Sequence, residues 1–480
     1  MKTRTILTLL AAAAGLCLAS CKQSEAQTTL IPGTAAENAA VIPDDYLGLS
    51  YESKMLVPNE EGKYYFDTDN QALLNILKTL GIRNIRIGGS STDNPNDPLP
   101  TLEDVDKFFQ FAREAGVRVI YSVRLRDGDP EYARGVARLI QNKYSDRIDY
   151  MAIGNEPGYY KDYDGLLKPH WAPIQQAINE VFPGVRFCAP DDNPNPPLCN
   201  YMLDNFGEKI GLVTMHYYPG DCAYTNPFKV KDVSELIPFD PAVKRELLLS
   251  DEMHPKYEGV LKRMAPVFER APFRLSETNS IWYGGLKDAS DSYASALWAL
   301  DYMYWWASKG SVGINFHTGD HVGGGDGTVV SRYAAFVTEG EGFDVRPISY
   351  AIKAFNEGAK GALVDVAVEG DDAGLSAYAT VRSGSINLTV INRQHGEEAA
   401  ERSIAIDLGG YTPAGKAQLL RLEAPDNDIA AQQGVTFGQT HICPKGNWHN
   451  AVPEQVRVRG NQLRITLQPA SAAVITIPVK

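Results

Sequence analysis

Short apolar runs alternate with amphipathic segments from about residue 44 to residue 357 of this 480-residue chain. The runs predict buried strands at 46–52, 82–87, 117–123, 148–153, 185–189, 212–215, 273–275 and 312–316. The segments between and after them predict helices at 71–80, 102–115, 131–142, 173–182, 201–206, 257–269, 291–308 and 347–355. Thr101, which precedes Glu103 and Asp104, is the expected cap of the second of these. Residues 220–251 carry proline and charge, which indicates an elaborated loop. Eight strands that alternate with helices predict a (β/α)8 barrel of the TIM type.

A different pattern begins at about residue 361. Gly, Asp and Asn separate short runs with alternating polarity, at 364–368, 374–380, 385–391, 402–408, 417–422, 463–467 and 472–478. This spacing predicts an antiparallel β-sandwich. We therefore expect a barrel domain at 41–358 and a sandwich domain at 359–480.

The first residues indicate export. Lys2 and Arg4 precede an apolar core, Ile6 to Leu18, that is too short to span a bilayer. The sequence Leu18-Ala19-Ser20-Cys21 resembles a bacterial lipobox, although a plain signal peptide cut nearby is the alternative. We expect a signal peptide at 1–20, a lipid on Cys21, a polar tether at 21–40, and an exported bacterial lipoprotein anchored to a membrane.

The remaining cysteines are expected outside the cytoplasm, where thiols can pair. Among Cys188, Cys199, Cys222 and Cys443 we expect one disulfide within the first three, which lie close in sequence. There is no CxxC motif and no histidine cluster, so no metal and no cofactor is expected.

The charge balance excludes one class of partner. The formal net charge is −13. Removal of residues 1–20 takes away Lys2 and Arg4 and no acid, which gives −15. A chain this acidic is not expected to bind nucleic acid.

Two glutamates follow predicted strands at positions where chemistry is expected. Glu156 comes after the run 148–153 and directly before Pro157, which ends a strand because it has no N–H to donate. Glu277 follows the run 273–275. Active sites of such barrels lie at the carboxyl ends of the strands, so the two carboxylates are expected to meet there. Either glutamate alone is more simply a solvated loop residue; the pair favours catalysis.

Several motifs together resemble glycoside hydrolase family 79, the β-glucuronidases and heparanases, over roughly residues 40–480. Ile153-Gly154-Asn155-Glu156-Pro157 is similar to the acid/base motif of glycoside hydrolases with (β/α)8 barrels. Ile85-Arg86-Ile87-Gly88-Gly89-Ser90-Ser91-Thr92-Asp93 and Leu275-Ser276-Glu277 narrow the resemblance. The family implies a retaining mechanism, with Glu156 as acid/base and Glu277 as nucleophile. It also implies a sandwich that shares an N-terminal strand, for which Thr28–Ile31 is the candidate.

The resemblance further implies which residues bind substrate. Asn155 would bind the sugar 2-hydroxyl, and Tyr218 would bind the nucleophile, with Tyr217 as its rival. The backbone of Tyr283 and Gly284, in Trp282-Tyr283-Gly284-Gly285, would receive a uronic carboxylate, although a simple turn explains these residues about as well. The other expected pocket residues are Glu52, Ser90, His317 and Tyr333, each of which has an alternative reading as a barrel-mouth residue without a ligand. The register of Tyr333 is uncertain because Gly323-Gly324-Gly325 precedes it.

These observations predict a retaining β-glucuronidase that removes terminal glucuronic acid, with or without a 4-O-methyl group, from a glycan. An endo-β-glucuronidase of the heparanase kind is the first alternative, which the acidic charge and the lack of a basic cluster in the sequence disfavour. A glycan-binding lipoprotein without catalysis is the second, which the presence of both glutamates disfavours.

Overall fold

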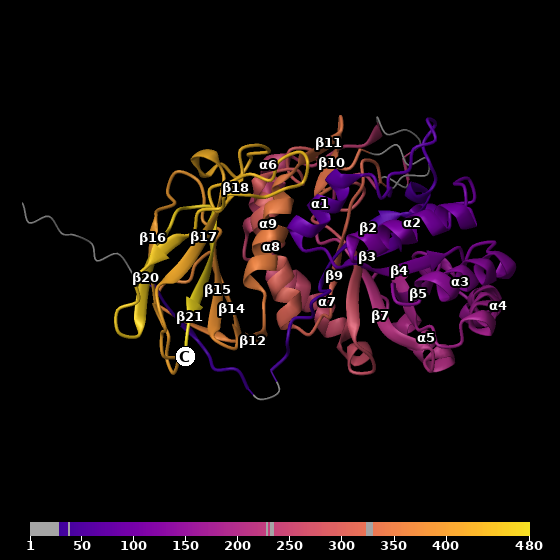
Figure 1. The fold of residues 1–480 in the computed structure, drawn as a ribbon, viewed down its shortest axis with the longest axis horizontal. Coiled ribbons are helices and arrows are strands. Elements are labelled where there is room, and N and C mark those ends of the chain that lie inside the picture. Colours follow the sequence, from indigo (N-terminus) through magenta and orange to yellow (C-terminus); the bar gives the residue numbers. More distant parts are fainter. Residues whose placement is uncertain (1–27, 37–38, 227–228, 231–234, 323–329) are drawn as a thin grey trace, which may run out of the picture.

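The computed structural model describes residues 28–36, 39–226, 229–230, 235–322 and 330–480. It confirms the predicted fold class, a closed barrel of eight parallel strands followed by antiparallel sheets (Figure 1). The predicted signal peptide, Cys21 and the Gly323–Gly325 run lie outside the described residues. Among the residues that are described, no helix has the length and apolar character needed to cross a membrane.

The barrel closes in sequence order, with the first strand paired to the last. Its strands are β2 (Leu47–Glu52), β3 (Asn84–Gly88), β4 (Arg118–Val123), β5 (Ile148–Ile153), β6 (Phe187–Asp192), β7 (Ile210–Tyr217), β8 (Phe273–Thr278) and β9 (Ile314–His317). All eight predicted strands are present, with ends shifted by a few residues.

The helices that surround the barrel follow from local sequence signals. In α1 (Gln71–Leu80) the side chain of Asn70 caps the first turn, and Gly81 ends the helix in the left-handed conformation that glycine adopts without strain. In α2 (Leu102–Ala115), Thr101 and Asp104 form a capping box, which confirms Thr101 as the predicted cap. The remaining barrel helices are α3 (Pro130–Tyr144), α4 (Lys168–Val181), α5 (Pro196–Phe206), α6 (Pro241–Leu249), α7 (Met253–Phe268), α8 (Tyr293–Ser308) and α9 (Pro347–Gly358).

The C-terminal region is a sandwich of two sheets. One sheet has the order β13-β1-β16-β20 and the other the order β12-β14-β15-β21-β17-β18, with β19 paired to β17. The strands after the barrel are β12 (Ala362–Val364), β13 (Val366–Glu369), β14 (Leu375–Arg382), β15 (Ser385–Asn392), β16 (Arg402–Asp407), β17 (Ala417–Glu423), β18 (Thr436–Phe437), β19 (Glu454–Val456), β20 (Gln462–Leu467) and β21 (Ser471–Pro478). The N-terminal β1 (Thr28–Pro32) lies between β13 and β16 in the first sheet.

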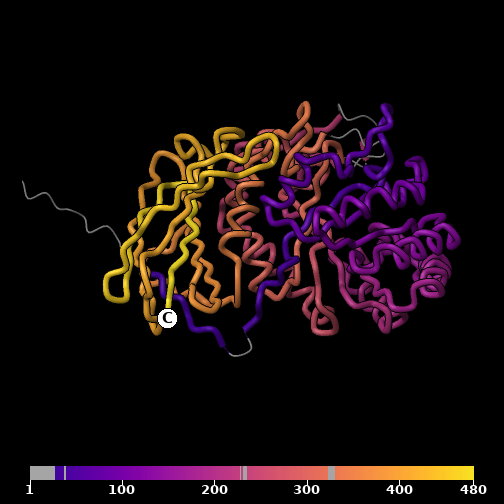
Figure 2. The backbone as a smooth tube through the Cα atoms, in the orientation of Figure 1, coloured from indigo at the N-terminus to yellow at the C-terminus, as the bar shows by residue number. Residues whose placement is uncertain are grey.

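Helices α8 and α9 lie between the barrel and the sandwich (Figures 1 and 2). Nearly every residue of α8 is buried, which is the pattern of a helix covered on all sides. Its polar groups find partners across the boundary: Tyr304 shares a 2.8 Å hydrogen bond with Thr389, and Asp301 accepts one of 2.8 Å from Tyr378. The two domains are therefore joined by a continuous packed interface.

Three predictions of secondary structure were wrong. The stretch 220–251 is not all loop, because Asp240 caps the helix α6 that begins at Pro241. The predicted strand 364–368 is two strands in different sheets, since β12 pairs with β14 while β13 pairs with β1. A hairpin of β10 (Phe336–Glu339) and β11 (Gly342–Val345) was not predicted.

The predicted disulfide is also wrong. Cys188, Cys199 and Cys222 are free thiols, as is the exposed Cys443. The first three belong to separate apolar clusters: Cys188 lies inside the barrel, Cys199 lies on the buried face of α5, and Cys222 packs against Ile281. Proximity in sequence did not bring them together, and each packs as a small hydrophobic side chain.

Candidate active site

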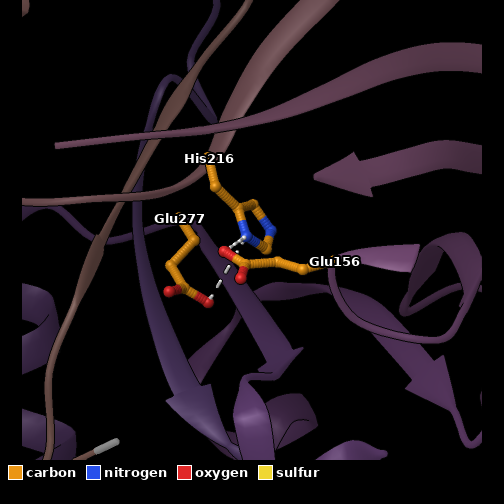
Figure 3. Close-up of side chains that lie close together, drawn as sticks. All are labelled: Glu156, His216 and Glu277. Carbon is orange, nitrogen blue, oxygen red and sulfur yellow. Dashed lines mark hydrogen bonds and ion pairs between the residues drawn. The ribbon is translucent and has the colours of Figure 1, made fainter. Parts of the chain in front are cut away.

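The two glutamates singled out by the sequence meet at the carboxyl end of the barrel. Glu277 belongs to β8, and Glu156 follows β5. One carboxylate oxygen of each, together with Nδ1 of His216, lie within 4.8 Å of one another. Figure 3 shows the three side chains pointing toward a common centre, with the imidazole beside both carboxylates.

Glu277 is held on both of its oxygens. Arg86 donates a hydrogen bond of 2.5 Å to Oε2, and the hydroxyl of Tyr218 donates one of 2.8 Å to Oε1. Burial alone would raise the pKa of Glu277, but its electrostatic interactions with His317, His216 and Arg86 and the hydrogen bond from Tyr218 lower it to about 2. This carboxylate is therefore ionised and fixed in position at neutral pH.

Arg86 organises the floor of the site from β3. Its guanidinium, fully buried, donates 2.5 Å hydrogen bonds to Glu277 and to Asp191, and a 2.7 Å bond to the amide oxygen of Asn155. Because burial opposes the charge while two carboxylates favour it, the net effect is to raise the pKa of Arg86. Gly88 is the last residue of β3. A Cβ on it would overlap the Arg86 guanidinium, so glycine at this position leaves room for the arginine side chain.

His216 lies between the carboxylates at the end of β7. Its Nδ1 is 2.9 Å from Glu156 Oε1 and 4.0 Å from Glu277 Oε2, and its Nε2 is 3.2 Å from Asp191 Oδ1. Burial alone would lower the pKa of His216, but Glu277 and Asp191 raise it to about 10. The imidazole is therefore a cation at neutral pH, and both of its nitrogens carry protons.

Glu156 has a different environment from Glu277. Its side chain is 39% exposed, whereas that of Glu277 is 11% exposed. Its backbone has φ 52° and ψ 57°, a left-handed conformation that costs energy for any residue with a Cβ. The Asp93 carboxylate accepts a 2.9 Å hydrogen bond from the backbone of Asn155, and the N–H of Glu156 donates to the carbonyl of Asp191. These bonds hold the strained turn that points Glu156 at the centre.

Glu52 is the last residue of β2 and Ser90 follows β3, and both border the mouth of the site. Glu52 is buried and accepts hydrogen bonds from the N–H of Ser91 at 2.8 Å and from its hydroxyl at 2.6 Å. Burial alone would raise the pKa of Glu52, but His317, 3.5 Å away, and Ser91 lower it. Gly89 has φ 73°, and a Cβ on it would collide with the Glu52 carboxylate. This explains the glycine pair Gly88-Gly89.

The tyrosines that the sequence singled out have different surroundings in the structure. Tyr218 contacts the nucleophile candidate, while its rival Tyr217 packs edge-on against Tyr257 and Trp306. Tyr333 stacks on Tyr218 with ring centroids 6.0 Å apart. Tyr283, at φ 58°, borders the cavity into which both glutamates open.

Gly284 is not among the residues that border this cavity, and its carbonyl accepts a hydrogen bond of 2.6 Å from the N–H of Arg332. The Gly285 N–H donates to the carbonyl of Trp282. Of the two residues predicted to bind the carboxylate, Tyr283 therefore borders the cavity and Gly284 does not.

Two adjoining cavities meet at Glu156. The first, of about 490 Å³, is the reaction cavity: both glutamates border it, with Tyr217, Tyr218, Arg263, Tyr283, His317 and Tyr333. The second, of about 840 Å³, contains Asn155 and Glu156 but not Glu277. Glu52, Ser90, Glu156 and Asn193 border both. Asn155 therefore faces the second cavity, with its amide oxygen already bound to Arg86.

Within the described residues, Glu156, His216 and Glu277 form the group of ligand atoms close enough to hold a metal ion. A metal ion at this centre would compete with the proton that Glu277 and Asp191 favour on His216, and the same three groups are placed for proton transfer and nucleophilic attack.

Sequence reasoning missed three residues of this site: Arg86, Asp191 and His216. Two of them lie close to residues that were singled out, since Arg86 is within the family motif and His216 is two residues before Tyr218. The signal that would have found Arg86 and Asp191 is a charged residue inside a buried strand, because such residues are almost never fully buried without partners.

Comparison with solved structures identifies related folds. A 4-O-α-L-rhamnosyl-β-D-glucuronidase from Fusarium oxysporum 12S matches with TM-score 0.69 and 17% identity, over 93% of this chain and 100% of that one. A GH51 arabinofuranosidase from Xanthomonas axonopodis pv. citri matches with TM-score 0.64 and 14% identity (94% and 100%). A monomeric β-xylosidase from Caulobacter crescentus CB15 matches with TM-score 0.63 and 14% identity (94% and 99%).

No protein-family sequence model matches the chain, and no curated protein sequence matches it. At identities of 17% and below, the structural likeness establishes the fold: a barrel with an attached β-domain that glycoside hydrolases of several kinds share.

Proposed function

We propose that this protein is a retaining glycoside hydrolase that removes terminal β-linked glucuronic acid, with or without 4-O-methylation, from a glycan. The observation that carries the proposal is the approach of the Glu156 and Glu277 carboxylates, whose facing oxygens lie within 4.8 Å. Retaining enzymes place their carboxyl groups about 5–5.5 Å apart, whereas inverting enzymes leave about 6.5–9.5 Å for a water molecule. The spacing supports attack by a carboxylate over attack by water.

The environments of the two glutamates fit the two roles. In the first step Glu277, ionised and held by Arg86 and Tyr218, attacks the anomeric carbon while Glu156 gives its proton to the departing glycosidic oxygen. This forms a glycosyl ester on Glu277 and releases the leaving group. In the second step Glu156 takes a proton from water, which attacks the same carbon and frees Glu277. The more exposed position of Glu156 suits a group that meets both the leaving group and water.

His216 is the positioning group between them. Its Nδ1–H donates to Glu156, and its charge faces Glu277 across 4.0 Å. A cation there stabilises whichever carboxylate is ionised at each stage. Since Asp191 lies behind the ring, the imidazolium keeps its orientation through both steps.

Two residues that border the reaction cavity support recognition of a uronic carboxylate. Tyr283, whose backbone is left-handed at φ 58°, borders the cavity, and backbone in this conformation can turn an N–H toward an anion. Arg263 is the one Arg or Lys among the described residues that border this cavity. The resemblance of the sequence motifs to family 79, and the fold likeness to a protein named as a glucuronidase, agree with this substrate class.

One experiment tests both the sugar and the roles. The unmodified enzyme should cleave an aryl β-glucuronide far faster than the aryl β-glucoside, which lacks the carboxylate. Comparable rates would overturn the uronic-acid assignment and leave the mechanism standing.

Glu156→Ala should lose about 10²–10⁴-fold in rate with a poor leaving group and much less with a good one, because a good leaving group needs little protonation. Azide should rescue this variant by attacking the glycosyl ester without a base.

Glu277→Ala is the matched comparison. It removes the nucleophile, so without azide it should be inactive with every leaving group, and no glycosyl ester should form. Azide can then act only by attacking the substrate in place of Glu277, which gives a glycosyl azide of inverted configuration, whereas the Glu156 variant should give one of retained configuration. Equal losses in the two variants across all leaving groups would contradict the assigned roles.

A further inference from the structure

A further cavity, the rear cavity, lies at the end of the barrel opposite to the active site. It has a volume of about 670 Å³ and is bordered by Leu47, the first residue of β2, and by Arg83, which directly precedes β3. Glu156 and Glu277 lie at the carboxyl ends of their strands, so a ligand in the rear cavity does not reach them. The volume is within the range of ligand sites, about 300–1,000 Å³. The rear cavity is therefore a candidate for binding without catalysis.

The rear cavity concentrates positive charge on an acidic protein. Four basic side chains border it against a single carboxylate, that of Asp44; the four are Lys78, Arg83, Lys360 and Arg382. The whole chain has a formal net charge of −13, so the charge of this cavity is opposite in sign to that of the protein. Exposed charges farther away than a Debye length, about 8–10 Å, are largely screened. A ligand in the cavity therefore meets the local positive charge.

Three of these cations have no acidic partner. Within the part of the chain that the structure describes, no carboxylate lies at ion-pair distance from Lys78, Arg83 or Arg382, and all three are exposed. The guanidinium of Arg382 donates to a neighbouring serine hydroxyl at 3.0 Å. Lys360 differs, because its Nζ lies 3.5 Å from the carboxylate of Glu357. The charge that a ligand can still pair with is therefore that of one lysine and two arginines.

The helix ends beside the cavity do not account for these cations. Lys78 lies in the last turn of α1 and Lys360 follows α9, where a cation can balance the helix dipole. Backbone donors already bind carbonyls at both ends: the N–H of Gly81 donates to two carbonyls of α1, and the N–H of Ala359 donates to one of α9. The two arginines of the cavity lie outside helices. Helix capping therefore leaves the gathering of four cations unexplained.

A side-chain amide without a partner borders the same cavity. Asn356 of α9 is partly buried, and its amide makes no hydrogen bond to the residues that the structure describes. A Cβ on Gly81, which has φ 75°, would lie 2.3 Å from this amide, so glycine leaves the side chain its place. An amide can donate to an anion and can exchange hydrogen bonds with a sugar hydroxyl. The cavity thus combines positive charge with a neutral hydrogen-bonding group.

We propose that the rear cavity binds a negatively charged stretch of a glycan, with Lys78, Arg83 and Arg382 pairing with its anionic groups and Asn356 bonding a hydroxyl. The choice of an acidic glycan as the ligand rests on the proposed function, because a polymer that carries glucuronic acid is a polyanion. A recess suits a chain segment that enters it better than a flat surface. Arg382 belongs to the sandwich and the other two cations to the barrel, so the bound segment contacts both domains.

This site would act on long substrates and leave small ones unaffected. A glycan held in the rear cavity keeps the enzyme on the polymer, which raises the local concentration of chain ends at the active site. An aryl β-glucuronide is too small to occupy both sites, and its cleavage does not involve the rear cavity. Loss of the cations should therefore weaken binding of a polyanionic glycan and leave kcat and KM for the aryl substrate unchanged.

Two triple variants of equal net charge test the inference. The cavity variant is Lys78→Gln/Arg83→Gln/Arg382→Gln. The control variant, which removes three exposed cations of the sandwich that do not border the cavity, is Lys416→Gln/Arg457→Gln/Arg464→Gln. The probe is a hyaluronan octasaccharide, which has a carboxylate on every second sugar, and its carboxyl-reduced form is the neutral comparison. Binding is measured with Glu277→Ala added to each protein, so that the probe is not cleaved.

With the cavity cations intact, the octasaccharide should bind at least about ten-fold more tightly than its carboxyl-reduced form. The cavity variant should bind the octasaccharide at least about ten-fold more weakly, whereas the control variant should keep the original affinity. Without the Glu277 change, both triple variants should cleave aryl β-glucuronide as the unmodified enzyme does. Equal affinities of the cavity and control variants for the octasaccharide would overturn the inference, as would equal binding of the two forms of the probe.

The results also separate this inference from the proposed function. If aryl β-glucuronide is cleaved but the cavity cations do not affect octasaccharide binding, the inference is overturned and the function stands. If no β-glucuronide is cleaved but octasaccharide binding depends on these cations, the function fails and the inference stands. Vesicles of phosphatidylcholine with and without phosphatidylglycerol test a lipid headgroup as the ligand. Binding to the anionic vesicles that depends on the cavity cations, without binding of the octasaccharide, would overturn the assignment of a glycan.

Discussion

The interior of the barrel mouth and the interior of the sandwich are built on opposite principles. The barrel mouth buries Arg86, Asp191, His216 and Glu277 together, and each charge is compensated by another. The sandwich core consists of aliphatic side chains such as Ile475, packed from both sheets. Burial of charge is unfavourable unless each group has its partner, whereas an apolar core needs only volume and shape. The barrel mouth has a function for its charges; the sandwich core gives stability alone.

The largest expected effect comes from breaking the charge network. Arg86→Met removes the cation that contacts Asp191 and Glu277 and leaves two carboxylates buried without it. The free energy of unfolding should fall by about 3–5 kcal/mol, as it does when one partner of a buried pair is lost. Activity per folded molecule should also fall, because Glu277 loses a donor at 2.5 Å. Denaturant unfolding and aryl glycoside kinetics measure the two effects; a stable and active variant would show that the network is dispensable.

The matched change in the sandwich should affect stability alone. Ile475→Ala, on β21 between β15 and β17, removes a fully buried side chain and should cost about 2–5 kcal/mol through lost burial and the cavity left behind. Its kcat/KM per folded molecule should equal that of the unmodified enzyme. If activity falls in parallel with stability under conditions where the variant is fully folded, the sandwich core is coupled to the site and does more than stabilise the fold.

The smallest effect is a change in the shape of the stability curve with pH. The pKa of His216 is raised from 6.5 to about 10 in the folded protein, so its contribution to stability is complete below about pH 6.5 and is lost as pH rises toward 10. The pKa of Glu277 is lowered from 4.5 to about 2, so its contribution is present above pH 4.5 and is lost as pH falls toward 2.

The unmodified protein should therefore lose stability on both sides of this window. His216→Gln should flatten the alkaline loss, while Ile475→Ala should lower the whole curve without changing its shape, since it removes no titrating group. Unfolding free energies measured between pH 2 and 10 test this, and an unchanged alkaline slope in His216→Gln would show that the histidine does not carry the extra proton in the fold.

The class of fold was predictable because periodicity is a local property. Alternating apolar runs and amphipathic segments gave all eight barrel strands, and the capping residue Thr101 gave the start of α2. The errors arose where an element is defined by the strands it pairs with or the side chains it packs against, and not by its own periodicity. The split of 364–368 into β12 and β13 depends on which sheet each half joins, and the separation of Cys188, Cys199 and Cys222 depends on how the strands and helices pack.

The positions of Glu156 and Glu277 could be predicted from the chain alone, because strand ends and the following Pro157 are local features. The charge arrangement of the site could not, because it arises from folding. Arg86, Asp191 and His216 lie on three different strands and become a network because the closed barrel turns their side chains to one centre.

The same holds for the rear cavity. The sequence contains no run of basic residues, yet the fold brings Lys78, Arg83, Lys360 and Arg382 to one cavity. The physical reason is that charges interact through space: their energies depend on the distances and burial that folding creates, and no local pattern encodes them.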